Sequence, residues 1–285
     1  MAIALLIRDG SPDWWASTDI WVVPGTDPNG TPGTPVVGNQ AYLWATVTNE
    51  GDQDASQVQV DFWVADPSLE IRKSTANHIG TAYADVAAGT SQAVLCLVPW
   101  RVTLVNGGHE CVVVEASSAA DPLSPPPADP DVLDALTYRQ IAQHNLSVMT
   151  VSGKSQHEIN IGVHAGLRAD KNVEVRLDVG GELSQHALAL LGVEAKRSVG
   201  AGHVSAALSE RSLCGEPNHE ERNSLHLRVP RGTSASVWLN VAARERLTPE
   251  QYAVIRVVEL QNGRVAGGLS LVVVGSDTKR KGAAQ

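Results

Sequence analysis

Short segments in which apolar and polar residues alternate recur along the chain, and this pattern constrains the fold more than any other feature. Residues 42–48 and 58–64 alternate in this way and are rich in β-branched and aromatic residues, which favour strands. Further segments of this kind follow at intervals of about 8–12 residues, with Gly, Pro, Asn or Asp between them, a rhythm typical of β-sandwiches and barrels. The first half contains no helix-period segment of useful length, which disfavours a parallel α/β fold.

The length of the chain, 285 residues, suggests two domains, because single domains usually contain about 100–150 residues. We therefore predict an all-β protein of two tandem immunoglobulin-like antiparallel β-sandwich domains. The first would cover residues 1–150 and end in a strand at 141–151. The second would cover residues 151–277 and be followed by a flexible basic tail at 278–285.

Two other segments have a distinct local pattern. Residues 24–39 are rich in Gly, Pro, Thr and Asn and predict a long loop, of a length that is often functional. Residues 183–191 suit a short helix. Near the C-terminus, Asn262-Gly263 between two apolar segments predicts a β-hairpin over residues 252–274.

Charge and hydropathy exclude several classes of partner. The net charge of −9 would repel a polyanion, so nucleic acid is a poor partner. No apolar run reaches 18 residues, so we expect no membrane insertion. The apolar run at the N-terminus is too short for a signal peptide and lacks a basic start. If Met1 is the true start, we expect a cytoplasmic or particle-associated protein.

A run of short motifs in the first half resembles a known family. In chain order the motifs are Asp13-Trp14-Trp15, Ser17, Asp19-Ile20-Trp21-Val22, Val47-Thr48-Asn49-Glu50-Gly51, Phe62-Trp63-Val64-Ala65-Asp66-Pro67, Ile79-Gly80-Thr81, Val98-Pro99-Trp100, Gly108-His109-Glu110-Cys111 and Ile141-Ala142-Gln143-His144-Asn145-Leu146. Over residues 11–148 they resemble bacterial CARDB-type modules (cell-adhesion-related domain found in bacteria). The resemblance implies an immunoglobulin-like sandwich with no catalytic residues and no cofactor, in proteins that are usually secreted or surface-bound. The second half is only generically immunoglobulin-like.

Six of the seven tryptophans lie in the first half, and an exposed one could form a flat platform for a sugar or peptide. In β-sandwiches, however, tryptophans more often fill the core. Trp14 and Trp15 are adjacent, so in an extended chain they point in opposite directions and one ring could be exposed. With Asp27 and Asn29 of the long loop, they are our candidate contact residues.

Metal sites are weakly indicated. Asp9, Asp13 and Asp19, or Asp27 with Asn29, could offer oxygen ligands to calcium, but turn formation explains them equally. A second group, which lacks the close ligand pairs of zinc sites, comprises His203, Cys214, His219, Glu220 and Glu221. We predict no metal and no cofactor.

The cysteines are few, and their chemistry stays open. His109 and Cys111 would share one face of a strand, with His144 as the nearest further metal ligand, or Cys111 is a buried thiol. Cys96 and Cys111 lie on strands predicted to be consecutive. They could form a disulfide if their Cα atoms come within about 7 Å.

No catalytic motif is recognisable, neither G-x-S-x-G, HExxH, a Walker loop nor GxGxxG. We therefore predict a non-enzymatic structural or protein-interaction protein: an adaptor, a spacer or a subunit of a larger assembly. It would bind a protein partner or itself through sandwich surfaces and edge strands. The alternative is a glycan- or calcium-dependent adhesion module.

Overall fold

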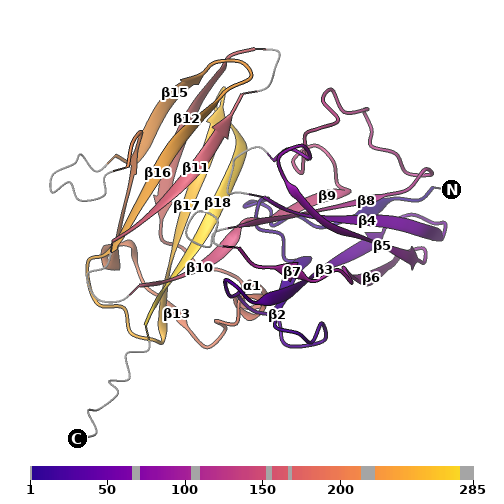
Figure 1. The fold of residues 1–285 in the computed structure, drawn as a ribbon, viewed down its shortest axis with the longest axis horizontal. Helices are drawn as coiled ribbons and strands as arrows, with labels where there is room; N and C mark the ends of the chain where they lie inside the picture. The colour runs from indigo at the N-terminus through magenta and orange to yellow at the C-terminus, as the bar shows by residue number, and fades with distance from the viewer. Residues whose placement is uncertain are drawn as a thin grey trace, which may run out of the picture.

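The structure, a computed structural model, describes residues 2–65, 71–103, 110–151, 156–165, 169–212 and 222–276. The fold is almost entirely β, as predicted, and Figure 1 shows two bodies of strands side by side, indigo to magenta and orange to yellow. Within the described residues, no helix is long and apolar enough to cross a membrane. The predicted basic tail lies outside the described residues.

The first body is a sandwich of two sheets, here the N-terminal sandwich. Sheet A consists of β1 (Leu5–Leu6), β2 (Ile20–Pro24), β3 (Gln40–Asn49), β6 (Thr90–Leu95) and β7 (Trp100–Arg101). Sheet B consists of β5 (Asn77–Val86), β4 (Ala55–Ala65), β8 (Cys111–Ser117) and β9 (Ile141–His144), in that order. The alternation in β3 is as predicted: Leu43, Ala45 and Val47 enter the core between the sheets.

The second body, here the C-terminal sandwich, has the same two-layer plan. Sheet C consists of β11 (Gln156–His164), β16 (Ser234–Ala243) and β14 (Val204–Ser209). Sheet D consists of β10 (Leu146–Val151), β18 (Arg264–Gly275), β17 (Gln251–Gln261), β12 (Lys171–Val179), β15 (Ser224–Val229) and β13 (Arg197–Ser198). The predicted hairpin joins β17 and β18, and Asn262 and Gly263 both have positive φ angles, of 53° and 75°.

The single strand predicted at residues 141–151 is wrong, because the chain changes body at Asn145. β9 pairs with β8 of sheet B, whereas β10 runs parallel to β18 of sheet D. The backbone N–H of Asn145 donates to Trp15 O at 2.7 Å, and the Asn145 carbonyl accepts from the Ser270 N–H at 2.9 Å. The sheets are therefore not purely antiparallel, since β13 also runs parallel to β17. That the two bodies fold as independent domains stays a prediction.

The predicted helix and loop are both present, and they contact each other. Helix α1 (Gln185–Leu190) is capped by the Ser184 hydroxyl, which accepts from the Ala187 N–H at 3.1 Å. A short 3-10 turn, η1 (Ala201–His203), is the other helical segment of the described chain. The Thr34 hydroxyl of the long loop donates to Leu191 O at the end of α1, at 3.2 Å.

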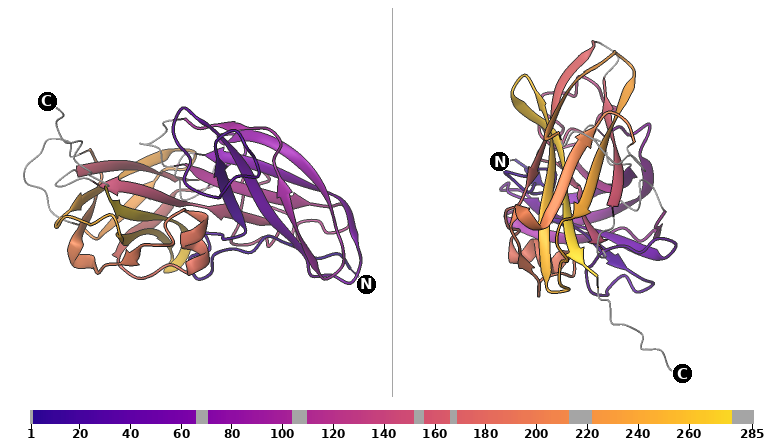
Figure 2. Two further views of the ribbon diagram at one scale, coloured as in Figure 1. Left: turned by 90° about the horizontal axis from the view of Figure 1, so that it is seen from below. Right: turned by 90° about the vertical axis from the view of Figure 1, so that its left-hand side faces the viewer.

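An apolar cluster joins the two sandwiches, separate from their two internal cores. The outer face of sheet B contributes Trp63, Cys111 and Val113, and the outer face of sheet D contributes residues that include Val254 and Val272. Both faces of β8 and of most of β18 are buried, and apolar residues predominate in their sequences, as is usual for strands covered on both sides. We call this apolar region the inter-sandwich cluster, and Figure 2 shows the two sandwiches lying next to each other.

Candidate functional site

The tryptophan pair singled out from the sequence lies inside the inter-sandwich cluster. Only 7% of Trp14 and 2% of Trp15 are exposed, and the rings meet edge-on with centroids 5.9 Å apart. The Trp15 Nε1–H donates to the Ser270 hydroxyl at 3.0 Å, and its ring packs on the Cα of Gly268. The expectation of one exposed ring is therefore wrong, because two sandwiches, rather than one, cover this segment.

The aspartates proposed for calcium have protein partners in the structure. Asp13 forms an ion pair with Arg256 Nε of β17 at 2.7 Å, which links the two sandwiches beside Trp14. Asp9 accepts from the Ser11 N–H within a turn. Asp19 accepts from the Arg8 N–H at 3.0 Å, and burial raises the pKa of the Asp19 carboxyl, although Arg8 opposes the shift. The described residues contain no group of three or more potential metal ligands.

A second tryptophan pair, which sequence reasoning missed, lies on the outer face of sheet A. Trp21 of β2 and Trp44 of β3 are directly paired across the strands. Their rings stack at 5.7 Å with only 8° between their planes, and both remain partly exposed. From the alternation of apolar and polar residues in each strand, one could have predicted that both rings point outward. Their register, which makes them neighbours, could not be read from the sequence.

The predicted contact residues Asp27 and Asn29 lie beside this second pair. The Trp44 Nε1–H donates to Pro28 O at 2.9 Å, so the loop is fastened against the stacked rings. Asp27 accepts from the Asn29 N–H at 2.9 Å, which forms a local Asx turn, and both side chains are exposed. The loop that carries Asp27 and Asn29 is thus bound through Pro28 to Trp44 of the second pair.

Cys96 and Cys111 do not form the disulfide that the sequence left open, and Cys214 lies outside the described residues. Cys96 and Cys111 are both free and buried, because Cys96 points into the core of the N-terminal sandwich while Cys111 points out of sheet B into the inter-sandwich cluster. Burial raises the pKa of the Cys111 thiol well above its usual value, so it is held protonated. Of the proposed zinc ligands, His203 lies 3.5 Å from Glu245, and His109 and the group from Cys214 to Glu221 lie outside the described residues.

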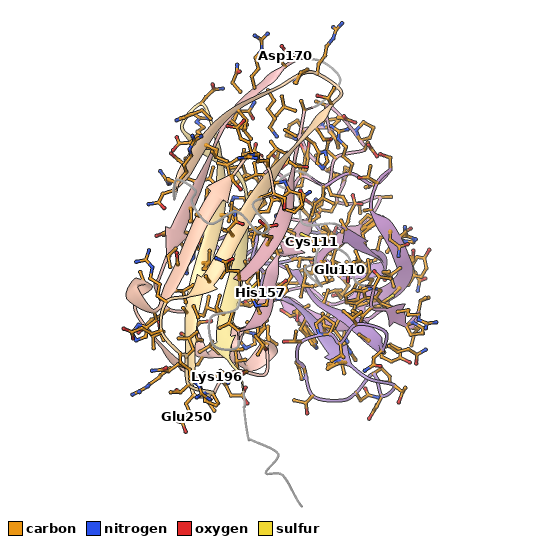
Figure 3. All side chains as sticks on the ribbon, turned by 60° about the vertical axis from the view of Figure 1, so that its left-hand side comes forward. Glu110, Cys111, His157, Asp170, Lys196 and Glu250 are labelled. Carbon is orange, nitrogen blue, oxygen red and sulfur yellow. The ribbon has the colours of Figure 1, made fainter. Side chains whose placement is uncertain are left out.

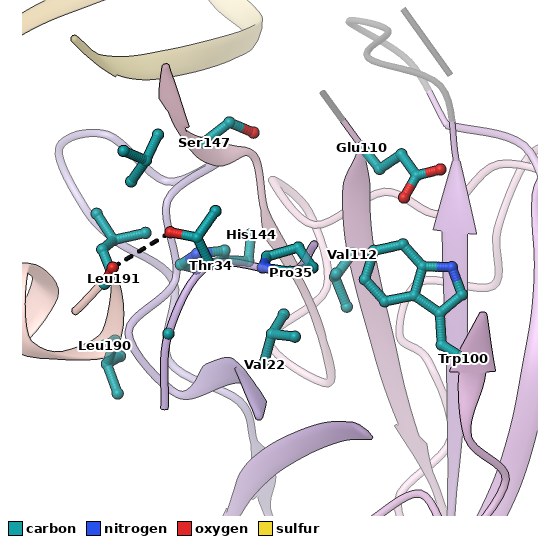
Figure 4. A pocket seen from close by; sticks show the side chains of 12 residues that line it. Val22, Thr34, Pro35, Trp100, Glu110, Val112, His144, Ser147, Leu190 and Leu191 are labelled. Atoms are coloured by element: carbon teal, nitrogen blue, oxygen red, sulfur yellow. Dashed lines mark hydrogen bonds between the residues drawn. The ribbon is translucent and has the colours of Figure 1, made fainter. Parts of the chain in front are cut away.

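A narrow pocket opens where the long loop, sheet B and α1 meet (Figure 4). Its cavity volume of ≈ 40 Å³ leaves room for a few water molecules at most. His144 lines it, and its Nδ1–H donates to Ser17 O at 2.6 Å. Burial lowers the pKa of His144, although this hydrogen bond opposes the shift, so the ring is neutral near neutral pH. The pocket suits packing around the crossover better than ligand binding.

Of the groups labelled in Figure 3, Glu110 and Cys111 belong to the N-terminal sandwich, and Asp170, Lys196 and Glu250 belong to the C-terminal sandwich. Asp170 lies at one end, where it binds Arg228 at 2.8 Å, while Lys196 and Glu250 lie at the opposite end. The Arg228 guanidinium and the Arg231 N–H lower the pKa of the Asp170 carboxyl. Asp170 therefore belongs to a local surface ion pair, and Lys196 donates to the backbone carbonyl of Pro249.

Comparisons with known proteins do not assign a family. No family model matches the chain, and no curated protein matches it. Among solved structures, the N-terminal domain of PorA is 10% identical with a TM-score of 0.26, over 45% of this chain and 87% of its own. The CupB6 tip adhesin from Pseudomonas aeruginosa is 11% identical with a TM-score of 0.26, over 96% of this chain and 98% of its own. Red sea bream transglutaminase is 12% identical with a TM-score of 0.24, over 90% of this chain and 31% of its own.

These similarities are too low to indicate a function. The CARDB-type resemblance of residues 11–148 accordingly stays a prediction. The β-sandwich architecture follows from the strand pairing and the two internal cores.

Proposed function

We propose that this chain is a non-enzymatic structural and protein-interaction protein that holds two β-sandwiches as one rigid body. The observation that carries the proposal is the inter-sandwich cluster, reinforced by the ion pair of Asp13 with Arg256. An apolar contact of this kind suppresses the relative motion that is the default between domains joined by a polar linker. A rigid pair of sandwiches suits a spacer or an assembly subunit, because it keeps distant surfaces at a fixed separation.

The edge of sheet A is the docking surface that we favour. Among the described residues, β6 forms a ladder only with β3, and residues 90–93 are exposed. The Cys96 N–H bonds Leu43 O of β3, so by alternation the Ala93 N–H points away from β3 and is free to bind an added strand. Beyond the strand, Leu97 and Val98 are 77% and 48% exposed, and they supply apolar contact area.

The test begins with capture of partners by the tagged full-length chain. The captured partner is then purified, and its affinity for the chain is measured. Ala93→Pro removes the outward N–H and should weaken the complex about tenfold or more, equivalent to ~1.4 kcal/mol. Ala93→Ser keeps the N–H and should leave the affinity unchanged. A chain that stays monomeric without a stoichiometric partner, or a complex that tolerates Ala93→Pro and Leu97→Glu, would count against this proposal.

The stacked Trp21–Trp44 pair favours a second candidate function, glycan binding. The flat, partly exposed rings offer a stacking surface, and the loop that Trp44 binds through Pro28 carries the exposed polar side chains of Asp27 and Asn29. Glycan arrays probed with the parent, Trp21→Ala and Asp27→Ala, with and without calcium, test it. Binding that both substitutions abolish supports this function. An array without signal, or binding that survives both substitutions, rejects it.

A further inference from the structure

The edge strand β6 lacks in its own residues the features that usually protect an exposed strand from pairing with a second strand. Such edges are commonly blunted by charged side chains, by proline or by a bulge. Residues 87–100 contain no charged residue, although the chain as a whole carries a net charge of −9. The register of β6 with β3 is regular from Thr90 to Leu95, with no bulge and no proline. An open, uncharged edge of this kind is a template for pairing.

The backbone groups that face outward determine how a second strand can pair with β6. Ser91, Ala93 and Leu95 alternate with the residues bonded to β3, so their N–H and C=O groups point away from β3. The Ala93 carbonyl accepts from the side-chain amide of Gln92 at 3.0 Å, a local bond that an incoming strand can replace. An antiparallel strand would exchange two hydrogen bonds with each of these outward-facing residues.

The side chains of this segment complement themselves when β6 meets its own copy in antiparallel orientation. Around a two-fold axis at Ala93, the two alanines face each other, and Ser91 lies opposite Leu95 of the second copy. Side chains that are directly opposite in such a pair lie about 5 Å apart, which suits two alanines. Continued beyond the strand, this register brings Leu97 to the turn at Gly89 of the second copy. Leu97 is 77% exposed, and a glycine leaves room for its side chain.

We infer that β6 binds β6 of a second copy of this chain, which joins the two sheets A into one continuous sheet. This partner choice rests on the docking surface proposed above. Two chains with a net charge of −9 repel each other, so a stable contact between them needs an uncharged region, which residues 87–100 provide. A two-fold contact also pairs both β6 edges at once, so the assembly closes as a dimer.

Sedimentation velocity of the purified full chain, without any other protein, measures self-association over a range of concentrations. The parent should form a dimer that dissociates on dilution. Ala93→Pro removes an outward N–H at the two-fold axis and should raise the dissociation constant of the dimer about tenfold or more. Ala93→Ser keeps this N–H and should dimerise like the parent.

Charges at the axis test whether each Ala93 meets its own equivalent. Ala93→Lys and Ala93→Asp should each be monomeric alone, because two like charges would lie directly opposite each other. An equimolar mixture of the two variants should restore the dimer, since opposite charges then meet. Leu136→Lys, a charge at an exposed position far from β6 in sequence, is the control and should dimerise like the parent.

Leu97→Glu lies outside the strand and should also weaken the dimer about tenfold or more, so it provides a test if the variants at Ala93 fold poorly. A parent chain that stays monomeric at every concentration overturns the self-pairing. The docking surface proposed above still stands in that case if a captured partner is sensitive to Ala93→Pro. Self-pairing through β6 is also overturned by a dimer that tolerates both Ala93→Pro and Leu97→Glu, or by folded charge variants whose mixture stays monomeric.

Discussion

The two tryptophan pairs of this chain have the same chemistry and opposite environments. Trp14 and Trp15 are neighbours in sequence, meet edge-on and are buried between the sandwiches. Trp21 and Trp44 are 23 positions apart, stack face to face and stay partly exposed on sheet A. The first pair therefore belongs to the cohesion of the molecule, and the second is available to a ligand.

The difference lies in what covers each pair. The segment with Trp14 and Trp15 is bonded on both sides, to β9 through Ser17 and to the crossover through Asn145, so sheets B and D close over it. Trp21 and Trp44 face away from the core of the N-terminal sandwich and stay partly exposed, and the long loop reaches Trp44 through Pro28. An aromatic ring is thus a core or a surface element according to the layer that packs on it.

The largest expected effect is the loss of the buried ring. Trp15→Ala should lower the free energy of unfolding by about 3–5 kcal/mol, because it leaves a cavity in the inter-sandwich cluster and an unpaired Ser270 hydroxyl. Trp21→Ala, the matched surface variant, should cost only about 1–2 kcal/mol. Urea denaturation followed by circular dichroism measures both. Equal losses would mean that the two environments do not differ energetically.

A medium effect is expected from Gly268→Ala. A Cβ at this position would lie 2.4 Å from Cδ2 of Trp15, so the ring or β18 must shift, at a cost of about 1–3 kcal/mol. Gly200→Ala is the control, since no atom lies within 4 Å of its Cβ position and its φ of −66° suits any residue. Thermal denaturation should show a lower melting temperature for Gly268→Ala. The melting temperature of Gly200→Ala should stay the same or rise slightly. A Gly268→Ala protein as stable as the parent would contradict the close contact.

The smallest expected effect is a dependence of stability on pH, which comes from a histidine beside the buried pair Trp14–Trp15. His144 holds the Trp14–Trp15 segment through Ser17, and burial lowers its pKa below the ordinary 6.5. Between the folded and unfolded pKa values the unfolded chain binds more protons. Neutral His144 therefore makes its full contribution to the free energy of unfolding above about pH 6.5. This contribution declines as the pH falls from that value toward the pKa of His144 in the folded protein.

Melting temperatures between pH 7 and pH 5 measure this dependence. His144→Gln should flatten the decline, whereas His226→Gln, a change at an exposed position of β15, should leave it as in the parent. The same decline in the His144→Gln variant would show that another group is responsible.

Much of the fold was predictable from residue patterns, and the particular failures share one cause. Alternation predicted β3, the Asn262-Gly263 pair predicted the β17–β18 hairpin, and residues 183–191 contain α1. The strand at 141–151 was misjudged, because its apolar pattern continues while its partners change at Asn145. The contact residues chosen from the sequence stay a prediction, and the structure separates them: Trp14 and Trp15 are buried, whereas the loop with Asp27 and Asn29 is bound to Trp44 through Pro28.

The sequence by itself determined the β class, the two-residue alternation of the strands and the positions of the turns, because these depend on neighbours along the chain. Only the tertiary structure decided which outer faces are buried. The mainly apolar sequences of β8 and β18 indicate burial on both sides, but they do not show which surface packs against the outer face. Contacts such as those of Trp15 with Gly268 and of Asp13 with Arg256 join residues more than 240 positions apart. Local propensity carries no information about such pairs, because the two residues interact only after both sandwiches have formed.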